Sequence, residues 1–495
     1  MLSVIKINEN DNVAVAVNKI SKGEIINISG TEIKAEDDIP AGHKIAIYDI
    51  ENGKDIIKYG FPIGVSKNDI KKGQWVHTHN IKTKLDKVLN YDYKPNFKEP
   101  INNKKEYKFM GYKRDNSSVG IRNEVWIIPT VGCVNAIADQ IARNSQKFKT
   151  DNIDGIFSYS HPYGCSQLGD DQLHTQKILS GLIKSPNAGA VLVIGLGCEN
   201  NQISLLKEVI GSYDEERVKF LVCQESENEI EDGVNIIEQL CAYASKFHRE
   251  ECDISNLVIG LKCGGSDGFS GITANPLVGE ISNIIVSHGG TSILTEVPEM
   301  FGAETLLMAR CRNEEVFKKT ADLINNFKSY FIKYGEHIDE NPSHGNKEGG
   351  ISTLEDKSLG CVQKGGNAVI EDVLLYGDTV SKKGLMLLQS PGNDLIASNA
   401  LAAAGSHIIL FTTGRGTPFS SPVPTIKISS NSNLAKHKKN WIDFDAGILL
   451  TGETMESTAD KLIQYILDVA SGNIHAKSEY LNKQEIAIFK DGVTL

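Results

Sequence analysis

Four times along this chain, an apolar strand ends in a glycine-containing turn that holds a cysteine. The strands Val125–Val131, Gly155–Ser160, Ala190–Ile194 and Leu257–Ile259 lead to Cys133, Cys165, Cys198 and Cys263. Amphipathic stretches with helical periodicity follow these turns. Strands that alternate with helices are typical of a largely parallel sheet, so the sequence predicts an α/β fold for most of the chain.

In parallel α/β sheets, ligands bind outside the carboxyl ends of the strands. We therefore expect one rim that carries all four thiols together with further side chains, namely His161, Glu199 and Asp267. A single free cysteine is most often a buried apolar residue, but four at the same position favour a functional rim. Imidazole, thiolate and carboxylate groups suit Fe(II), Zn or Mn. A cysteine-ligated iron–sulfur cluster is an alternative, although no CxxC spacing supports it.

Two further segments offer anion-binding groups. Residues 270–276, which follow Asp267, read as a polar loop that opens a helix, where backbone amides can bind an anion or simply cap the helix. The strand Ile408–Phe411 leads into a Gly-Arg-Gly loop, in which Arg415 can hold a carboxylate between flanking glycines. Lys347 offers a second cation, unless it is an ordinary surface lysine.

Two pairs of residues extend this set. His77 and His79 alternate, so on a strand they would share one face, either as ligands or as exposed histidines. Glu296 and Glu299 follow the strand end Ser292–Leu294, and Glu296 is the better candidate for an active-site carboxylate.

The chain divides by sequence style. Residues 1–95 contain short alternating strands with turn residues between them, typical of a small β domain. Residues 96–108 lack any periodicity and are predicted to be a linker; residues 109–249 and 250–495 are predicted to form two α/β domains. Residues 335–366 read as a loop.

Charge and composition exclude several classes of protein. Of 495 residues, 52 are Lys or Arg and 63 are Asp or Glu, giving a net charge of −11, which argues against nucleic-acid binding. No apolar run approaches the ~18–20 residues of a membrane helix, and the N-terminus lacks the pattern of a signal peptide. The nine cysteines contain no CxxC pair, so we expect free thiols in a reducing cytoplasm.

Three long motifs, at residues 195–202 (GLGCENNQ), 263–276 (CGGSDGFSGITANP) and 411–418 (FTTGRGTP), resemble the altronate/galactarate dehydratase family. The first 90 residues resemble its N-terminal SAF (β-clip) domain, and the resemblance covers essentially the whole chain. Residues 76–80, 129–135 and 165–171 are most similar to the altronate branch. One departure is His344, where the family usually has proline.

This resemblance implies a hydro-lyase that removes water from a sugar acid. For the altronate branch, D-altronate would give 2-dehydro-3-deoxy-D-gluconate in hexuronate catabolism. The resemblance also implies Fe(II) or Mn(II), no organic cofactor, and a small-molecule sugar acid as partner; a homodimer is compatible with it. A divalent metal can act as a Lewis acid on substrate oxygens while a base removes the C2 proton.

The expected roles form three groups. The catalytic candidates are His161, Cys263, Asp267 and Glu296. The substrate-binding candidates are Ser266, Asn275, Lys347, Thr413, Gly414 and Arg415. The metal ligands are expected among His77, His79, Cys133, His161, Cys165, Cys198 and Glu199. Three alternatives stay open: a dehydratase of the same family that acts on galactarate or another aldarate, a non-catalytic protein that binds a sugar acid, and an iron–sulfur hydro-lyase.

Overall fold

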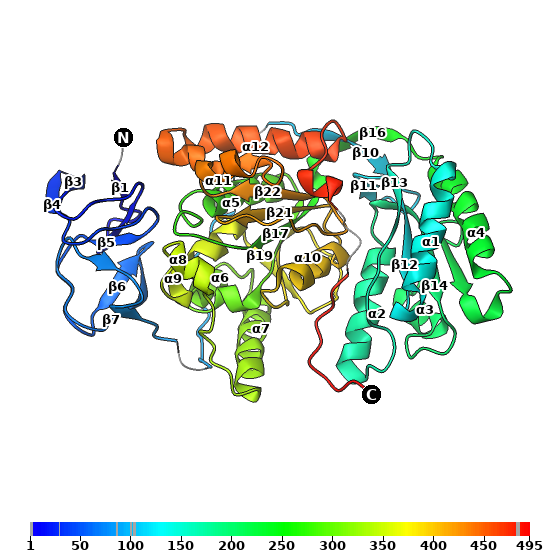
Figure 1. Ribbon diagram of the computed structural model, residues 1–495, viewed down its shortest axis with the longest axis horizontal. Helices are drawn as coiled ribbons and strands as arrows, with labels where there is room; N and C mark the ends of the chain where they lie inside the picture. Colours follow the sequence, from blue (N-terminus) through cyan, green and yellow to red (C-terminus); the bar gives the residue numbers. More distant parts are fainter. Residues whose placement is uncertain (1–2, 29, 86–87, 100, 102–104, 482–485) are drawn as a thin grey trace.

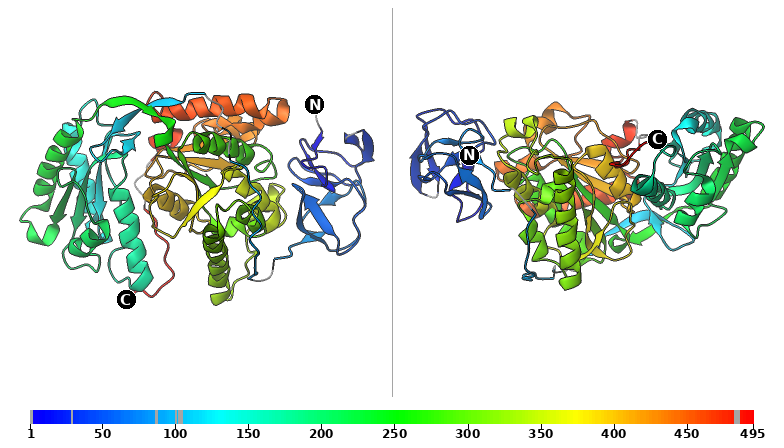
Figure 2. Two further views of the ribbon diagram at one scale, coloured as in Figure 1. Left: turned by 180° about the vertical axis from the view of Figure 1, so that it is seen from behind. Right: turned by 90° about the horizontal axis from the view of Figure 1, so that it is seen from below.

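The computed structural model describes residues 3–28, 30–85, 88–99, 101, 105–481 and 486–495. The expected linker, residues 96–108, lies partly outside these ranges. The C-terminal α/β domain occupies the middle of the molecule, with the N-terminal β domain at one end and the second domain at the other (Figure 1). The view from behind shows the same order (Figure 2). The N-terminal domain therefore packs on the C-terminal domain, which lies far from it in sequence.

The N-terminal domain consists of short antiparallel strands in three small sheets, ordered β1-β2-β5-β8, β3-β4 and β6-β7-β9. Alternating isoleucines such as Ile26, Ile33 and Ile45 point inward and form its core. The strands are β1 (Val4–Ile5), β2 (Val13–Ala16), β3 (Ile25–Ile28), β4 (Thr31–Lys34), β5 (Lys44–Ala46), β6 (Asp55–Lys58), β7 (Phe61–Ser66), β8 (Trp75–Val76) and β9 (Ile81–Lys82).

The second domain has a four-stranded parallel sheet in the order β13-β12-β14-β15. Its strands are β12 (Glu124–Pro129), β13 (Gly155–Ser158), β14 (Ala188–Gly195) and β15 (Val218–Val222). Its helices are α1 (Asn135–Ser145), α2 (Gly169–Ile183), α3 (Ile203–Ile210) and α4 (Glu229–Ala244). A small antiparallel sheet of β10 (Lys108–Lys113), β11 (Val119–Gly120) and β16 (Arg249–Asp253) joins this domain to the next.

The C-terminal domain has a seven-stranded parallel sheet in the order β19-β20-β18-β17-β21-β22-β23. Its strands are β17 (Val258–Cys263), β18 (Thr291–Leu294), β19 (Ile370–Leu374), β20 (Gly384–Leu388), β21 (Ile408–Thr413), β22 (Thr425–Ser429) and β23 (Phe444–Asp445). Its helices are α5 (Ala274–Ser287), α6 (Glu304–Met308), α7 (Glu314–Lys333), α8 (His344–Glu348), α9 (Leu354–Cys361), α10 (Asp394–Ala403), α11 (Ser432–His437) and α12 (Met455–Ala470). The β-rich N-terminal domain followed by parallel α/β domains confirms the predicted fold class.

The two α/β domains share one apolar core, in which Trp126 and Val193 of the second domain join Ile409 and Phe411 of the C-terminal domain. The end of the chain returns to the second domain, where the Leu495 amide donates to the Ser166 carbonyl at 2.9 Å. The two domains are therefore held together by more than a linker. Within the described residues, no helix is long and apolar enough to span a membrane.

Candidate functional site

The order of the C-terminal sheet reverses between β17 and β21, which are neighbours although most of the domain separates them in sequence. A reversal of this kind opens a crevice beyond the carboxyl ends of the two strands, where ligands bind in open α/β sheets. Cys263 is the last residue of β17, and Gly414 and Arg415 follow directly after β21. Both motifs that sequence analysis singled out here therefore meet at one place.

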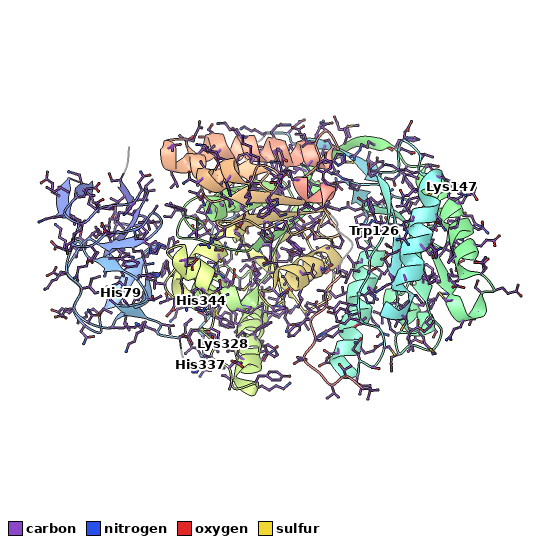
Figure 3. All side chains as sticks on the ribbon, in the orientation of Figure 1. His79, Trp126, Lys147, Lys328, His337 and His344 are labelled. Atoms are coloured by element: carbon purple, nitrogen blue, oxygen red, sulfur yellow. The ribbon has the colours of Figure 1, made fainter. Side chains whose placement is uncertain are left out.

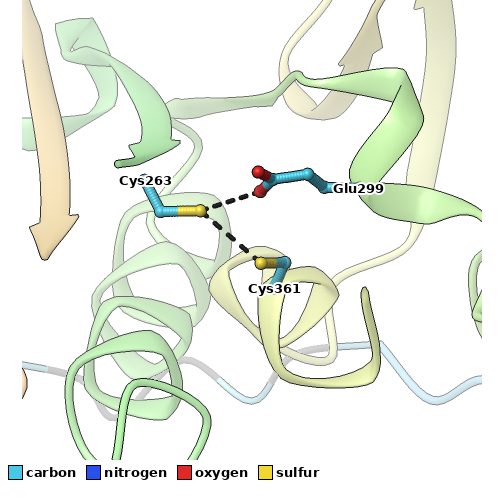
Figure 4. Close-up of side chains that lie close together, drawn as sticks. All are labelled: Cys263, Glu299 and Cys361. Carbon is cyan, nitrogen blue, oxygen red and sulfur yellow. Dashed lines mark hydrogen bonds between the residues drawn. The ribbon is translucent and has the colours of Figure 1, made fainter. Parts of the chain in front are cut away.

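Three buried side chains come together at the end of β17 (Figure 4). The sulfur of Cys263 lies 2.9 Å from Glu299 Oε2 and 3.5 Å from the sulfur of Cys361. Among the described residues, Cys263, Glu299 and Cys361 are the only set of three His, Cys, Asp or Glu ligand atoms that lie within 4.8 Å of one another. Two thiols and a carboxylate are a plausible donor set for a borderline divalent ion.

The ionisation of the two cysteines differs because of their neighbours. The hydrogen bond from Cys361, helped by Lys364 and opposed by burial, lowers the pKa of Cys263 to about 6. Lys364 Nζ lies 2.9 Å from the Cys263 sulfur. The same hydrogen bond and burial raise the pKa of Cys361 well above its ordinary value. These interactions favour the thiolate form of Cys263 and the protonated form of Cys361.

Three buried lysines surround this cluster. Lys262 pairs with Glu296 and, at 2.9 Å, with Asp394. Lys357 pairs with Glu299 at 2.8 Å. Burial alone would lower the pKa of Lys357, but the Glu299 carboxylate raises it above the ordinary value, so the amine stays charged.

Glu296 itself has a left-handed backbone with φ of 71°. A residue other than glycine adopts this conformation at a cost, which is typical of functional sites.

A cavity of about 630 Å³ opens beside the cluster. Its lining contains Cys263, Glu299, Asn346, Lys357 and Asp394, together with aromatic side chains of α7. This volume is within the range of small-molecule sites. Lys357 is the cation of this lining, which also contains the carboxylates of Glu299, Glu336, Glu340 and Asp394. A small anion would therefore bind at the Lys357 ammonium group.

Two of the predicted site residues, Asp267 and Gly414, hold together the loops that follow β17 and β21. Asp267 is buried and accepts hydrogen bonds from Ser430 Oγ at 2.7 Å and from Asn431 Nδ2 at 3.0 Å. Burial raises its pKa and these hydrogen bonds oppose that rise. Gly414 packs directly on Asp267, because a Cβ at Gly414 would lie 2.2 Å from the Asp267 Cγ.

The remaining substrate-binding candidates differ in what they contact. Asn275 accepts a hydrogen bond from Thr412 and donates to Gly360, and Thr413 accepts from the Gly416 amide. Arg415 is half exposed and pairs with Glu348 at 3.2 Å. Lys347 lies partly exposed near the end of α8, and Ser266 has a buried hydroxyl with no hydrogen-bond partner. Of these, Ser266 alone has a buried polar group left open.

His77 and His79 do not lie on a strand, because β8 ends at Val76 and a turn follows. The expectation of a shared strand face is therefore wrong. Instead, the His77 ring stacks on the Trp75 ring, and the centroids of the His79 and Trp75 rings lie 5.1 Å apart. Figure 3 shows His79 in the N-terminal domain and His344 at the start of α8 in the C-terminal domain. The link between the two domains here is His43, whose Nε2 lies 3.1 Å from the Glu348 carbonyl oxygen.

The expectation of one rim with four cysteines is wrong. Cys133, Cys165 and Cys198 follow β12, β13 and β14 of the second domain, whereas Cys263 ends β17 of a different sheet. His161 and Glu199 lie with the first three. The expected metal ligands are thus divided between the second domain and the N-terminal domain, at opposite ends of the molecule (Figure 1).

Sequence analysis did not single out Lys262, Lys357, Cys361 or Lys364, and it ranked Glu299 below Glu296. Three of the four lie in residues 335–366, which were expected to form a loop. That expectation is wrong for residues 344–348 and 354–365, where α8, α9 and a short 3-10 helix form. The available signal was the run Thr353-Leu354-Glu355-Asp356, since Thr353 caps α9 through the Asp356 amide.

Comparison with known proteins covers the whole chain. Residues 2–84 match "Altronate/galactarate dehydratase SAF domain", residues 111–245 match "D-galactarate dehydratase/Altronate hydrolase, second domain", and residues 254–494 match "D-galactarate/Altronate dehydratase, C-terminal". The chain is 51% identical to an altronate dehydratase of Bacillus subtilis and 50% identical to one of Escherichia coli, each over 100% of both chains. It is 34% identical to an Escherichia coli galactarate dehydratase (L-threo-forming), over 94% of this chain and 92% of that protein. The cavity at the end of β17 lies within residues 254–494, the longest of the three matched segments. Since all three domains match, the chain belongs to the D-galactarate/altronate dehydratase family.

Proposed function

We propose that this protein dehydrates D-altronate to 2-dehydro-3-deoxy-D-gluconate, a step of hexuronate catabolism, in the reducing cytoplasm. The observation that carries the proposal is the identity of 50–51% to two altronate dehydratases over the full chain, against 34% to a galactarate dehydratase. The cavity beside Cys263 supports it, because Lys357 in its lining can pair with the carboxylate of a small anion. A homodimer stays a prediction.

The proposal is tested by turnover of altronate, galactarate and mannonate, with the 2-keto acid product detected by a carbonyl reagent. We expect kcat/KM for altronate to exceed that for the other two by ~10-fold or more, a difference of about 1.4 kcal/mol in transition-state binding. Faster turnover of galactarate would instead favour an aldarate dehydratase. Tight binding of altronate without any keto acid would identify a non-catalytic binding protein.

We propose that the cluster of Cys263, Glu299 and Cys361 holds the divalent metal of this family. Its three ligand atoms lie within 4.8 Å of one another, and all three side chains are buried. Thiolate ligands favour Fe(II) over Mn(II), which prefers oxygen donors. When bound, the metal would supply Lewis-acid stabilisation of negative charge on the substrate.

The other groups of the cavity have roles that follow from their contacts. Lys357 is the buried cation that lines the cavity, so we assign it to the substrate carboxylate. Lys262 and Lys364 are not part of the cavity lining, and they place buried ammonium groups beside Glu296 and Cys263. The aromatic side chains of α7 exclude water from one side.

Removal of a thiol should weaken metal binding specifically. We expect the variants Cys263→Ser and Cys361→Ser to bind Fe(II) more weakly by ~100-fold or more, because loss of a mere supporting group already costs 10–100-fold. The matched control is Cys311→Ser, a buried cysteine of the same domain that hydrogen-bonds Thr320. Metal content after gel filtration measures the effect. Unchanged iron content in both cluster variants would refute the ligand assignment.

A further inference from the structure

The second domain holds a group of three cysteines that the proposed function does not use. Of the nine cysteines, six are buried or half-buried, and the three exposed ones are Cys133, Cys165 and Cys198. Free cysteine is normally among the most buried residue types. All three exposed thiols occur in one domain, which makes random surface placement a poor explanation.

These three cysteines lie at the carboxyl edge of three adjacent parallel strands. Cys133 follows β12, Cys165 follows β13 and Cys198 follows β14, and β12 lies between the other two strands. The sheet order reverses at β12, and open α/β sheets form their ligand-binding crevice at such an edge. Helices α1, α2 and α3 begin two to five residues after the cysteines. Their positive N-terminal ends favour a negatively charged group at this edge.

The loops that carry the cysteines are fixed against one another. The Gly132 amide donates to the Tyr163 carbonyl at 2.9 Å, and the Asn201 amide donates to the Gly164 carbonyl at 2.9 Å. Gly164 has φ of +101°, and a Cβ there would lie 2.0 Å from the Thr130 carbonyl oxygen. Only glycine allows so close an approach, so the three loops form one rigid unit.

His161 and Glu199, expected as ligands, support these loops instead. Both nitrogens of the His161 ring are used: Nε2 lies 2.7 Å from the Pro129 carbonyl oxygen, and Nδ1 accepts from the Tyr163 amide at 3.2 Å. Burial lowers the pKa of His161 to about 4, so the ring is neutral. Glu199 accepts from Thr130 Oγ1 and from the Gly197 amide, both at 2.6 Å. His161 and Glu199 therefore already have hydrogen-bond partners, and the loops offer thiols together with the buried, unpartnered Asn201 Oδ1.

The distances between the three sulfurs distinguish a single metal ion from an iron–sulfur cluster as the ligand. Zn–S bonds are about 2.3 Å, so two thiolates on one ion lie at most about 4.6 Å apart. Cys133, Cys165 and Cys198 do not form a set with all three sulfurs within 4.8 Å of one another, since among the described residues only Cys263, Glu299 and Cys361 form such a set. In an iron–sulfur cluster, each cysteine binds a different iron, so wider spacing is required.

We propose that Cys133, Cys165 and Cys198 bind an iron–sulfur cluster in the crevice of the second domain. Each cysteine binds one iron as a thiolate and releases its proton. One of the sulfurs already accepts a hydrogen bond, since Gln224 Nε2 lies 3.5 Å from the Cys198 sulfur. Three cysteines leave the fourth position of a four-iron cluster to a non-protein ligand. The site is separate from the cavity at Cys263 and lies in another domain.

The test is anaerobic reconstitution of the full chain with ferric iron, sulfide and a thiol reductant, followed by desalting. We expect a broad visible absorption band and iron and acid-labile sulfide in equal amounts. Each of Cys133→Ser, Cys165→Ser and Cys198→Ser should lose most of this band. The control is Cys223→Ser, a half-buried cysteine that follows β15 at the same edge of the sheet. It should retain the wild-type spectrum.

A second measurement does not depend on variants. Iodoacetamide should alkylate all three cysteines in the cluster-free protein and leave them unmodified after reconstitution, as read by mass spectrometry. Iron bound without sulfide, a chromophore that survives in the three variants, or equal loss in Cys223→Ser would overturn the proposal. Since sulfide content and alkylation are measured without substrate, failure here leaves the dehydratase proposal unaffected.

Discussion

Replacement of Lys357 by methionine should lower kcat by about 10²–10³-fold, the usual cost of removing one preorganised electrostatic group from an active site. Lys357 is the buried cation that lines the cavity beside Cys263, and its Nζ lies 2.8 Å from Glu299 Oε1. Methionine keeps the length of the side chain and removes its charge. The substrate carboxylate then enters the cavity without its counter-ion, so turnover under saturating altronate measures the loss.

The same change leaves the Glu299 carboxylate buried without its lysine, which costs about 3–5 kcal/mol of stability in comparable pairs. The double variant Lys357→Met with Glu299→Gln removes both charges and should recover most of that stability without recovering activity. The matched surface control is Lys318→Ala on α7, whose exposed pair with Glu314 contributes little. Full turnover by a folded Lys357→Met enzyme would contradict the assignment.

The strands were predictable because burial on both faces of a parallel sheet produces continuous apolar runs. The run Ala190–Ile194 appears as β14, which extends two residues before the predicted range and one beyond it. Cysteines at strand ends were also found from sequence. Which strands share a sheet was not predictable, since pairing of β17 with β21 joins segments about 150 residues apart. For that reason the prediction that all four cysteine turns lie on one rim was wrong, although each turn was identified correctly.

The segment 335–366 shows why part of the site was missed. Helix α9 is short, and all of its side chains are buried, including Asp356 and Lys357. A helix usually reveals itself by alternating an apolar face with a polar one. Here the charged face points into a domain interface and a cavity, so the pattern resembles that of an exposed loop. The partners that make these charges tolerable, Lys44 and Glu299, lie far away in sequence.

Replacement of Asp356 by asparagine should detach the N-terminal domain from the C-terminal domain. Asp356 pairs with Lys44 at 2.8 Å and with Lys58 at 2.9 Å, and all three side chains are at most 2% exposed. Asparagine leaves two buried ammonium groups without a counter-ion, at a cost of about 3–5 kcal/mol. Total stability of a domain is only about 5–15 kcal/mol, so this loss is large. Urea unfolding and the rate of proteolysis in residues 88–99 report it.

The pH dependence of this contact has a definite sign. Burial would raise the pKa of Asp356, but Lys44 and Lys58 hold it well below its ordinary value. The contribution of Asp356 to stability is therefore complete above about pH 4, its unfolded value, and is lost only as the pH falls through the depressed folded value. The stability gap between wild type and Asp356→Asn should be constant at neutral pH and narrow only in strong acid. The matched control is Asp55→Asn, which removes an exposed pair with Lys84 and should cost less than about 1 kcal/mol. If Asp356→Asn were no less stable than Asp55→Asn, the buried triad would not be what holds the N-terminal domain in place.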